Sequence, residues 1–446
     1  MTMRRYGRKA LCIVAVLAAP LFILCAIFVY GVPVPYWDQW ELVPMLQRLN
    51  NHSLQIADLW AQQNEHRILL PRAVMLLLAK LTGWNIYFEF LASYAIAFTT
   101  FVLLWSMLRR TFDGKLPIWI AVALSLVVFS PIQYENWLWG WQIQFFMANL
   151  GVVAAAWSLH RWPDSYKGLA VAIAAAAFSS FSLSSGLFLW IAMVPLLIFA
   201  GPRNWRHILI WCASSAAVFS LYFHNYVKPP VHPSLGSFIE APGRFMRYVA
   251  IYLGSPLGFG KPDAAVSMGI LTLLVATVVF FLLRKSRYGE TGFLMPWIAI
   301  GLQAALCALG TAIGRSGYGA RQAMSSRYST FASLLLIAVM AVVAKWLAMP
   351  RQRDSSHRGN GRKAFAAALL IIFAVTYALT FAHSLKAMES RRKQLQTCRD
   401  ELMAFPNTSE EALGQLYPLE MIQDTRARAQ ALREMGMILP PEPLRK

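Results

Sequence analysis

The chain has 446 residues, of which 57% are hydrophobic and only 14% are charged. A soluble domain carries about 25% charged residues, so this composition excludes an ordinary soluble enzyme and indicates a polytopic α-helical membrane protein. The formal net charge of +20 does not predict a nucleic-acid partner, because most basic residues fall in short clusters between apolar runs, as in cytoplasmic loops.

The first apolar run, residues 10–31, follows a basic stretch and is long enough to span a membrane. No small-residue cleavage site follows it, so we expect an uncleaved helix with a cytoplasmic N-terminus. Residues 32–85 then form an extracytoplasmic first loop. Within this loop, the apolar segment 68–81 has about 14 residues, which is too short for a span and predicts an interfacial or re-entrant helix.

The later apolar runs have Lys and Arg on alternate sides, as the positive-inside rule requires. With the first helix they predict about eleven spans, with the N-terminus inside and the C-terminus outside. These runs are residues 86–108, 116–132, 145–160, 169–181, 187–200, 208–223, 268–283, 293–312, 330–347 and 364–381. Two of them are short and are separated by residues 182–186, which favours half-length helices that meet a water-filled cavity.

The expected fold class is therefore an all-α polytopic membrane bundle. Residues 1–383 form its transmembrane module, and residues 384–446 form a small helical extracytoplasmic tail in which we identify no chemistry. Thr408 and Glu411 have the spacing of a capping box, which predicts a short helix there. The cysteines are isolated, so neither a disulfide framework nor a paired-cysteine metal site is expected.

The first polar motif follows the first helix directly, where Asp38 lies between Trp37 and Trp40. An acid clamped between two indoles at a membrane surface is partly desolvated, and desolvation raises the pKa of a carboxyl group toward the range that a general base needs. Asp38 is the candidate base. Trp37 is a candidate contact for a sugar or acceptor, and the alternative for it is an ordinary interfacial aromatic belt.

Glu65, His66 and Arg67 end the same loop, at the start of the 68–81 segment. Glu65 and His66 are candidate catalytic residues. The guanidinium of Arg67 suits phosphate recognition, because its planar fork can donate two hydrogen bonds to one oxyanion. The alternative is a salt-bridged helix cap.

Residues 133–142 join two helices on the outside and are rich in tryptophan, amide and acid side chains. Indole faces stack on sugar rings and amides bond to hydroxyls, although the same composition is typical of an aromatic belt. The candidate sugar or acceptor contacts are Glu135, Trp137, Trp141 and Gln142.

A second basic motif joins two late spans on the outside, although the positive-inside rule permits few cations there unless an anion holds them. The predicted phosphate-binding residues are Arg315, Arg321, Arg327 and Tyr328. Lipid headgroup contact is the alternative. The chain has no Asp-x-Asp, Walker, Gly-x-Ser-x-Gly or His-Glu-x-x-His motif, so we expect no metal and no cofactor.

An acid just past the first helix, a long first external loop with a short helix, and about eleven spans resemble the layout of the GT-C superfamily of integral membrane glycosyltransferases. The resemblance covers residues 1–383 and is specific at Asp38, which matches the first-loop catalytic acid of that superfamily. The motifs around Glu65, Gly186 and Arg327 resemble those of bacterial polytopic membrane proteins.

The resemblance implies a polyprenyl-phosphate-linked sugar as donor and an inverting transfer to a glycan or lipid acceptor on the extracytoplasmic face of a bacterial inner membrane. Asp38 would take the proton of the acceptor, and Glu65 or His66 would orient the acceptor or support Asp38. Arg67, Arg315, Arg321 and Arg327 would hold the departing lipid phosphate. The alternatives are a transporter or flippase of an anionic lipid-linked saccharide, and a glycan ligase or polymerase.

Overall fold

The computed structural model describes residues 2–199, 204–229, 237–285, 291–349, 356–418 and 421–437. Within these ranges the chain is helical, with one isolated bridge between Gln63 and His66 and no strand. Nine of the described helical stretches are long and apolar enough to cross a membrane, by length and composition. The predicted all-α polytopic membrane fold is therefore confirmed.

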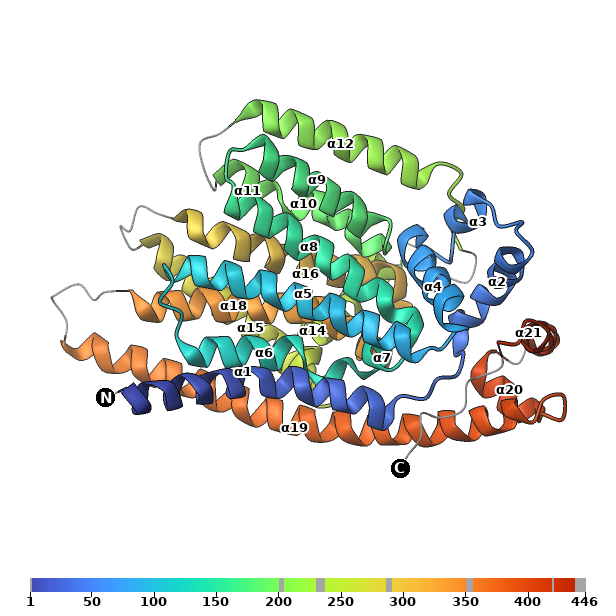
Figure 1. The fold of residues 1–446 in the computed structure, drawn as a ribbon. Helices are drawn as coiled ribbons and strands as arrows, with labels where there is room; N and C mark the ends of the chain where they lie inside the picture. Colours follow the sequence, from blue (N-terminus) through green and yellow to red (C-terminus); the bar gives the residue numbers. More distant parts are fainter. Residues whose placement is uncertain are drawn as a thin grey trace.

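The long helices lie side by side along one direction (Figure 1). They are α1 (Thr2–Tyr30), α5 (Tyr87–Thr111), α6 (Ile118–Val128), α8 (Ile143–Arg161), α12 (Trp205–Phe223), α15 (Pro262–Lys285), α16 (Met295–Arg315), α18 (Ser329–Ala348) and α19 (Ser356–Met403). Two shorter apolar stretches accompany them, namely α9 (Tyr166–Ser180) and the broken segment Ser184–Phe199. Each predicted run falls on one of these stretches, while the number that cross and their orientation stay predictions.

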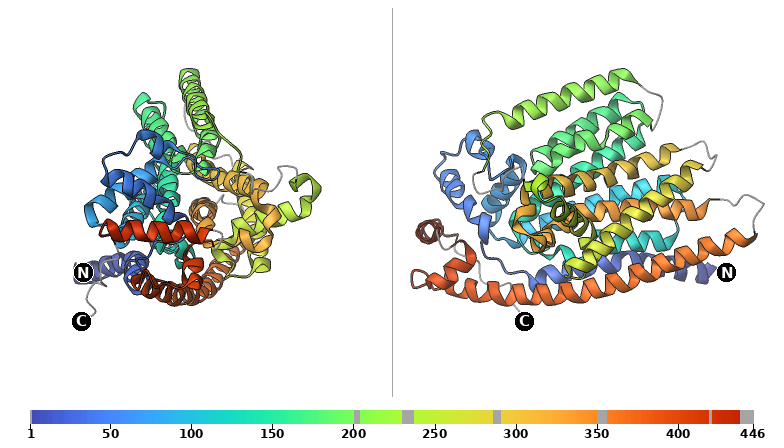
Figure 2. Two further views of the ribbon diagram at one scale, coloured as in Figure 1. Left: turned by 90° about the vertical axis from the view of Figure 1, so that its right-hand side faces the viewer. Right: turned by 180° about the vertical axis from the view of Figure 1, so that it is seen from behind.

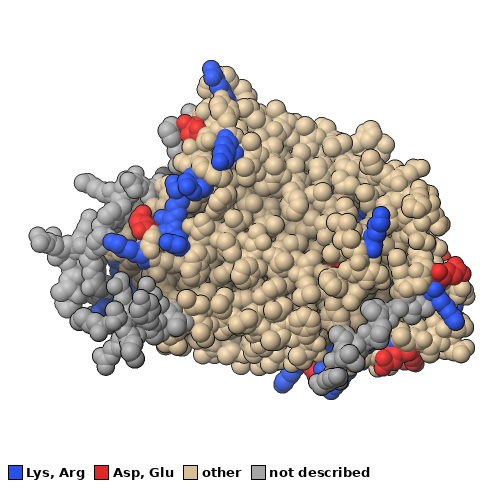
Figure 3. Space-filling view, in the orientation of Figure 1, with Lys and Arg blue, Asp and Glu red and all other residues tan. Residues whose placement is uncertain are grey.

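The outer surface fits a lipid environment. On the face in Figure 3 the charged side chains lie toward the two ends, and a broad band between them is almost free of charge. Large apolar side chains such as Leu274 and Phe281 of α15 and Ile371 of α19 are exposed. In a soluble protein such a surface would be a liability, whereas in a bilayer it faces hydrocarbon.

The short helices of the first loop lie together at one end of the bundle, opposite the N-terminal end of α1 (Figures 1 and 2). They are α2 (Val43–Asn50), α3 (Ile56–Trp60) and α4 (Leu69–Thr82). The helix α4 has 14 residues and is not among the candidate spans, as expected from the short apolar segment 68–81. It ends at Gly83, whose backbone has the left-handed conformation that favours glycine.

Two details differ from the expected helices. The run 187–200 is not one helix, because Pro195 lacks the N–H that would continue the ladder, and the segment divides into η4 (Ser184–Phe188), α10 (Leu189–Ala192) and α11 (Val194–Phe199). The region between α12 and α15, which has no predicted span, contains α13 (Ser237–Glu240) and α14 (Pro242–Gly254).

The missed helix α14 packs closely on α15. A Cβ atom on Gly254 would lie 1.9 Å from the Ala265 carbonyl oxygen, and one on Gly269 would lie 2.1 Å from the Ala250 carbonyl oxygen. Glycines at both contacts let the two backbones approach, as in many membrane helix pairs. This approach brings Tyr248 and Tyr252 of α14 toward the loops at the end of α16.

The last long helix, α19, has 48 residues and continues without a break through the predicted boundary at residue 383. It is followed by α20 (Glu410–Leu416) and α21 (Ile422–Glu434), which lie at the same end of the bundle as α2 to α4 (Figure 1). The cap of α20 is Ser409 and not Thr408, because the Ser409 hydroxyl accepts the Ala412 N–H. The end of the predicted tail, 438–446, lies outside the described residues, as do residues 350–355 between the last two predicted spans.

Candidate active site

The polar motifs that the sequence singled out come together at the end of the bundle that carries α2 to α4. Asp38 lies in the short helix η1 (Trp37–Leu42), and Glu65 to Arg67 lie in the loop before α4. Arg315 is the last residue of α16, and Arg327 lies in η8 (Ser326–Tyr328) at the start of α18. Chain segments far apart in sequence thus place their charged residues at one site.

Asp38 is half-buried within η1, a single 3-10 helix whose first residue, Trp37, has a positive φ of 47°. The two flanking indoles lie in different environments: Trp40 is fully buried in the core, whereas Trp37 is 44% exposed. On its buried side, η1 is held by Gln39, whose Nε2 donates to the Glu89 carboxylate at 2.6 Å. Asp38 is therefore presented at the surface of a well-anchored turn.

The charge state of Asp38 follows from its surroundings. Burial raises its pKa above the ordinary value of 3.8, Arg327 and Arg315 act in the opposite direction, and Glu41 and Glu65 add to the increase. The net effect is a raised pKa. A carboxyl group so placed is under the electrostatic influence of two cations and still binds a proton more readily than a solvated aspartate, as a general base requires.

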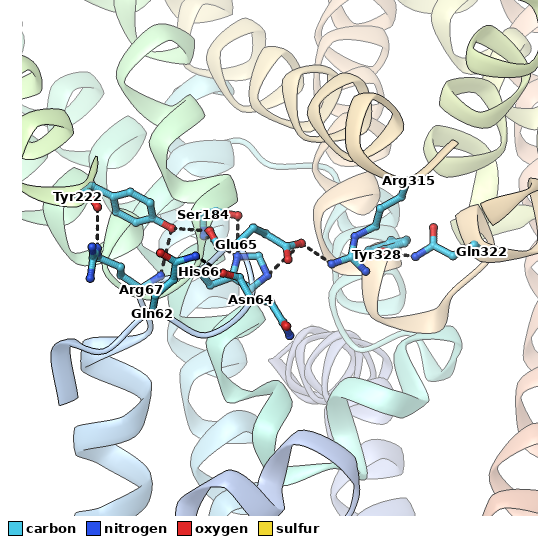
Figure 4. Close-up of polar contacts among 10 residues, drawn as sticks. All are labelled: Gln62, Asn64, Glu65, His66, Arg67, Ser184, Tyr222, Arg315, Gln322 and Tyr328. Atoms are coloured by element: carbon cyan, nitrogen blue, oxygen red, sulfur yellow. Dashed lines mark hydrogen bonds and ion pairs between the residues drawn. The ribbon is translucent and has the colours of Figure 1, made fainter. Parts of the chain in front are cut away.

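Glu65 has the opposite environment. Its carboxylate forms an ion pair with Arg315 and lies 3.5 Å from His66 Nε2, as Figure 4 shows. The other ring nitrogen of His66, Nδ1, lies 2.7 Å from the Ser184 hydroxyl. Burial opposes ionisation of Glu65, but His66 and Arg315 outweigh it and lower its pKa to about 2. Glu65 is thus a permanent anion that holds Arg315, whereas Asp38 is the acid that can exchange a proton.

The turn that carries Arg327 is fastened to the 131–137 loop by backbone and side-chain bonds. The Arg327 N–H donates to Glu135 Oε2 at 3.0 Å, and Asn136 Nδ2 donates to the Arg327 carbonyl at 3.0 Å. The Ser326 hydroxyl accepts the Glu135 N–H at 3.1 Å. Among the described residues the Arg327 guanidinium donates no hydrogen bond, and it lies 5.7 Å from the Tyr328 ring centre. Its backbone is held while its side-chain donors stay available.

Tyr328 supports this turn from inside. Its hydroxyl accepts Gln322 Nε2 at 2.6 Å, and its ring stacks on Tyr252 at 5.1 Å. Gln322 Oε1 in turn accepts the Tyr248 hydroxyl. No local motif in the sequence marks Gln322, Tyr248 or Tyr252 as part of this site. The Tyr328 hydroxyl accepts the hydrogen bond from Gln322 and still has its own O–H to donate, so its part in phosphate binding stays a prediction.

Arg67 is also used within the protein. The side chain is buried, and its donors reach the backbone carbonyls of Tyr222 at 2.6 Å, Trp60 at 3.0 Å and His224 (Figure 4 shows the Tyr222 contact). The guanidinium also lies 5.1 Å from the Trp60 ring centre. Arg67 therefore ties the first loop to the end of α12, and these contacts favour a structural role over the predicted phosphate binding.

Replacing Arg67 with leucine is expected to destabilise the protein by about 3 kcal/mol, because three carbonyl groups lose a charged donor inside the structure. Thermal unfolding of the purified protein checks this. Arg321 is the matched control, since it is exposed and lacks a recorded partner among the described residues, and Arg321→Leu should leave the unfolding temperature unchanged. An equal effect of both substitutions would contradict the structural role of Arg67.

Three of the predicted sugar contacts belong to the core instead. Trp137 and Trp141 are almost fully buried, and a sugar ring cannot stack on an enclosed indole. Gln142 is buried beside them. Trp137 Nε1 donates to the Ser130 carbonyl at 3.0 Å, and its ring packs 4.5 Å from that of Phe146. Only Trp37 and the half-buried Glu135 lie at the surface of the site.

The loop that contains these residues passes directly over Glu89. A Cβ atom on Gly140 would lie 1.8 Å from Glu89 Oε2, so a larger residue there would displace the buried carboxylate. Glu89 also accepts Trp84 Nε1 at 2.9 Å. This buried acid therefore joins the first loop, η1 and the 134–142 segment. Its role was not predicted, because an acid in the first turn of a helix such as α5 is common.

Within the described ranges, no group of three or more His, Cys, Asp or Glu side chains could hold a metal ion. No family model matches the sequence, and no curated protein matches it. The fold is similar to the crystal structure of ArnT from Cupriavidus metallidurans bound to undecaprenyl phosphate, with a TM-score of 0.45 and 12% sequence identity, over 97% of this chain and 76% of that one. At this degree of similarity, the residues of the site must support any functional inference.

Proposed function

We propose that the protein is a membrane glycosyltransferase that moves a sugar from a polyprenyl-phosphate donor to a cell-envelope acceptor on the extracytoplasmic face. The observation that supports this most directly is the position of Asp38, a half-buried acid with a raised pKa that faces Arg327 and Arg315. One proton acceptor and two cations at one site match the two needs of such a transfer, namely removal of the acceptor proton and stabilisation of the leaving phosphate.

The residues divide these tasks. Asp38 takes the proton from the acceptor hydroxyl as its oxygen bonds to the anomeric carbon, and the bond from that carbon to the lipid phosphate breaks on the opposite face of the sugar. Arg327 donates to the phosphate oxygens as negative charge develops on them. Arg315, held by Glu65, places a second guanidinium at the site. This arrangement inverts the configuration of the anomeric carbon.

The membrane location of the site suits such a donor. Arg315 ends α16 and Arg327 precedes α18, so both cations lie at the ends of apolar helices. A polyprenyl chain would remain in hydrocarbon while its phosphate reaches this level. The positive-inside pattern of the loops supports an extracytoplasmic position for that end of the bundle.

The proposal is tested with purified protein in lipid nanodiscs, a polyprenyl-phosphate donor with a labelled sugar, and an extract of envelope glycolipids as acceptors. We expect the label to leave the donor and the free polyprenyl phosphate to accumulate. If protein in sealed vesicles instead moves the intact donor between leaflets without releasing the sugar, the protein is a transporter and the proposed transfer is wrong.

The pH dependence of the transfer follows from the two acids. A base must be deprotonated to act, so the rate should fall as the pH falls through the raised pKa of Asp38, above the 3.8 of an ordinary aspartate. Glu65, with a pKa of about 2, stays ionised over this range and adds no second step. A profile of kcat/KM between pH 4 and 8 should therefore show one acid limb, and a flat profile would contradict Asp38 as the base.

A further inference from the structure

The place of Asp38 depends on what holds η1, because this helix has only six residues. Gln39 and Glu89 hold it from the core side, as described above. On the outer side the next acid, Glu41, is only partly exposed, and its carboxylate is paired. Its Oε1 accepts Arg428 Nη1 at 2.9 Å and also the Tyr417 hydroxyl. Both partners belong to the C-terminal tail, and Arg428 is 387 residues away from Glu41 in the sequence.

This contact differs from an ordinary surface ion pair. The side chains of Arg428 and Glu41 are 15% and 28% exposed, and the Arg428 guanidinium lies 5.5 Å from the Tyr417 ring centre. Burial and the Glu41 carboxylate raise the pKa of Tyr417 to about 12, so its hydroxyl remains a donor at neutral pH. A partly buried carboxylate with two donors is held more firmly than an exposed pair, whose strength is near zero to 1 kcal/mol.

The C-terminal part of α19 contacts the residues that precede Asp38. The Arg391 guanidinium lies 4.5 Å from the ring centre of Tyr36 and 5.8 Å from that of Trp139. Tyr36 and Trp139 also contact each other edge to face at 5.2 Å, and Trp139 Nε1 donates to the Tyr36 carbonyl at 2.9 Å. The tail therefore contacts the chain two residues before Asp38 and three residues after it.

Apolar packing joins the two parts between these polar contacts. Pro35, Trp84 and Ile86 of the first-loop side face Leu402, Ala429 and Leu432 of the tail across a cavity of only 20 Å³. A space of this size holds little more than one water molecule, so the tail is closely packed against the segment. The tail is thus a fixed part of the end of the bundle that carries Asp38.

We propose that the C-terminal tail clamps the Asp38 segment, and that Arg428 is a positioning residue which holds η1 in place and neutralises Glu41 beside the base. The role of Asp38 as base rests on the proposed function, whereas the clamp itself does not. The contacts of Glu41 with Arg428 and Tyr417 and of Tyr36 with Arg391 support it.

The clamp has an electrostatic consequence for Asp38. The charged groups that face Asp38 are Arg327, Glu41, Arg315 and Glu65. Glu41 favours the protonated form of Asp38, and Arg428 compensates the charge of Glu41. Without Arg428 this compensation is lost, so the pKa of Asp38 should rise further, and the acid limb of the transfer rate should move to higher pH by about half a unit.

The first test needs no substrate. Hydrogen exchange of the full-length protein in nanodiscs is compared between wild type, Arg428→Gln and Arg426→Gln. Arg426 is the matched control, because it lies on the same helix and pairs instead with Glu410 of the tail at 3.5 Å. We expect exchange in the 36–42 segment to become about tenfold faster in Arg428→Gln only. Unchanged exchange in that variant would overturn the clamp.

A second arm separates positioning from folding. Tyr417→Phe removes one hydrogen bond from Glu41 and should accelerate exchange at 36–42 by a smaller factor, while exchange in α5 and α8 stays at the wild-type rate. Arg428→Lys keeps the positive charge, so it should restore the pH profile more fully than the rigidity of η1. A Lys variant whose acid limb moves as far as that of Arg428→Gln would contradict the electrostatic role.

The two proposals fail in different ways. If no sugar donor reacts but Arg428→Gln still loosens the 36–42 segment, the glycosyltransferase proposal fails and the clamp stands. If transfer occurs and depends on Asp38, but Arg428→Gln changes neither the exchange nor the pH profile, the clamp fails alone.

Discussion

Asp38→Asn is expected to lower the rate of sugar transfer by about 1000-fold, because the amide keeps the shape of the side chain but cannot take a proton from the acceptor. The surrounding contacts should persist, since η1 is held by Gln39 and Glu41 and not by Asp38 itself. The rate is measured as release of labelled sugar from a polyprenyl-phosphate donor by protein in nanodiscs. Binding of the unreacted donor, measured on the same preparation, should stay within about threefold of wild type.

Asp263→Asn is the matched control for this substitution. Asp263 lies in the first turn of α15, outside the site. Its side chain is 90% exposed and pairs with Arg247 at 2.7 Å. Its replacement removes an equal charge from the protein and should leave the transfer rate unchanged. Wild-type transfer by Asp38→Asn would eliminate the mechanism proposed here, whereas loss of donor binding in this variant would mean that Asp38 acts in binding.

Arg327→Lys is expected to reduce the transfer rate by about 100-fold although it keeps the positive charge. A guanidinium donates two parallel hydrogen bonds to one phosphate, and an ammonium group cannot reproduce that geometry. The backbone of residue 327 is held by Glu135 and Asn136, so the lysine side chain starts from the same place. The loss should appear in kcat more than in KM, because the phosphate carries its additional charge only as the bond breaks.

Arg321→Lys is the parallel control. Arg321 belongs to the same loop and was also predicted to hold the phosphate, but its side chain is exposed, so we do not expect it to bind the lipid phosphate. Its transfer rate should match that of wild type. If Arg327→Lys keeps the full rate, the guanidinium is a surface charge and not a phosphate ligand. If Arg321→Lys loses as much rate as Arg327→Lys, the loop acts through its net charge and not through one fixed side chain.

Much of the architecture was predictable from apolar run length alone. A backbone in hydrocarbon has to satisfy its own hydrogen bonds, so a run of about 20 apolar residues leaves helix as its stable form. The helix α14 was not predicted, because its sequence mixes polar and apolar residues and so is not forced to be a spanning helix. It is a helix that packs closely on α15 through Gly254 and Gly269.

The sequence also predicted a cluster of ionisable residues that includes Asp38, Glu65, Arg315 and Arg327. Ionisable side chains at helix ends on one side of a membrane avoid hydrocarbon and therefore tend to lie together. Their separate roles were not predictable. Glu65 and Asp38 are both acids of the first loop, yet one is fixed by Arg315 and the other has a raised pKa. Arg67 and Arg327 carry the same side chain, yet only the first donates to buried backbone carbonyls.

Composition and apolar run length are enough to predict a helical membrane protein with its ionisable residues gathered at the ends of apolar helices. They are enough because the free energy of placing charge and unbonded backbone in hydrocarbon leaves few alternatives. The three-dimensional packing was needed to show which guanidinium donates to the backbone, which indoles are enclosed, and that the C-terminal tail reaches Glu41. These features depend on contacts between residues that are far apart in the chain, and such contacts leave no local pattern.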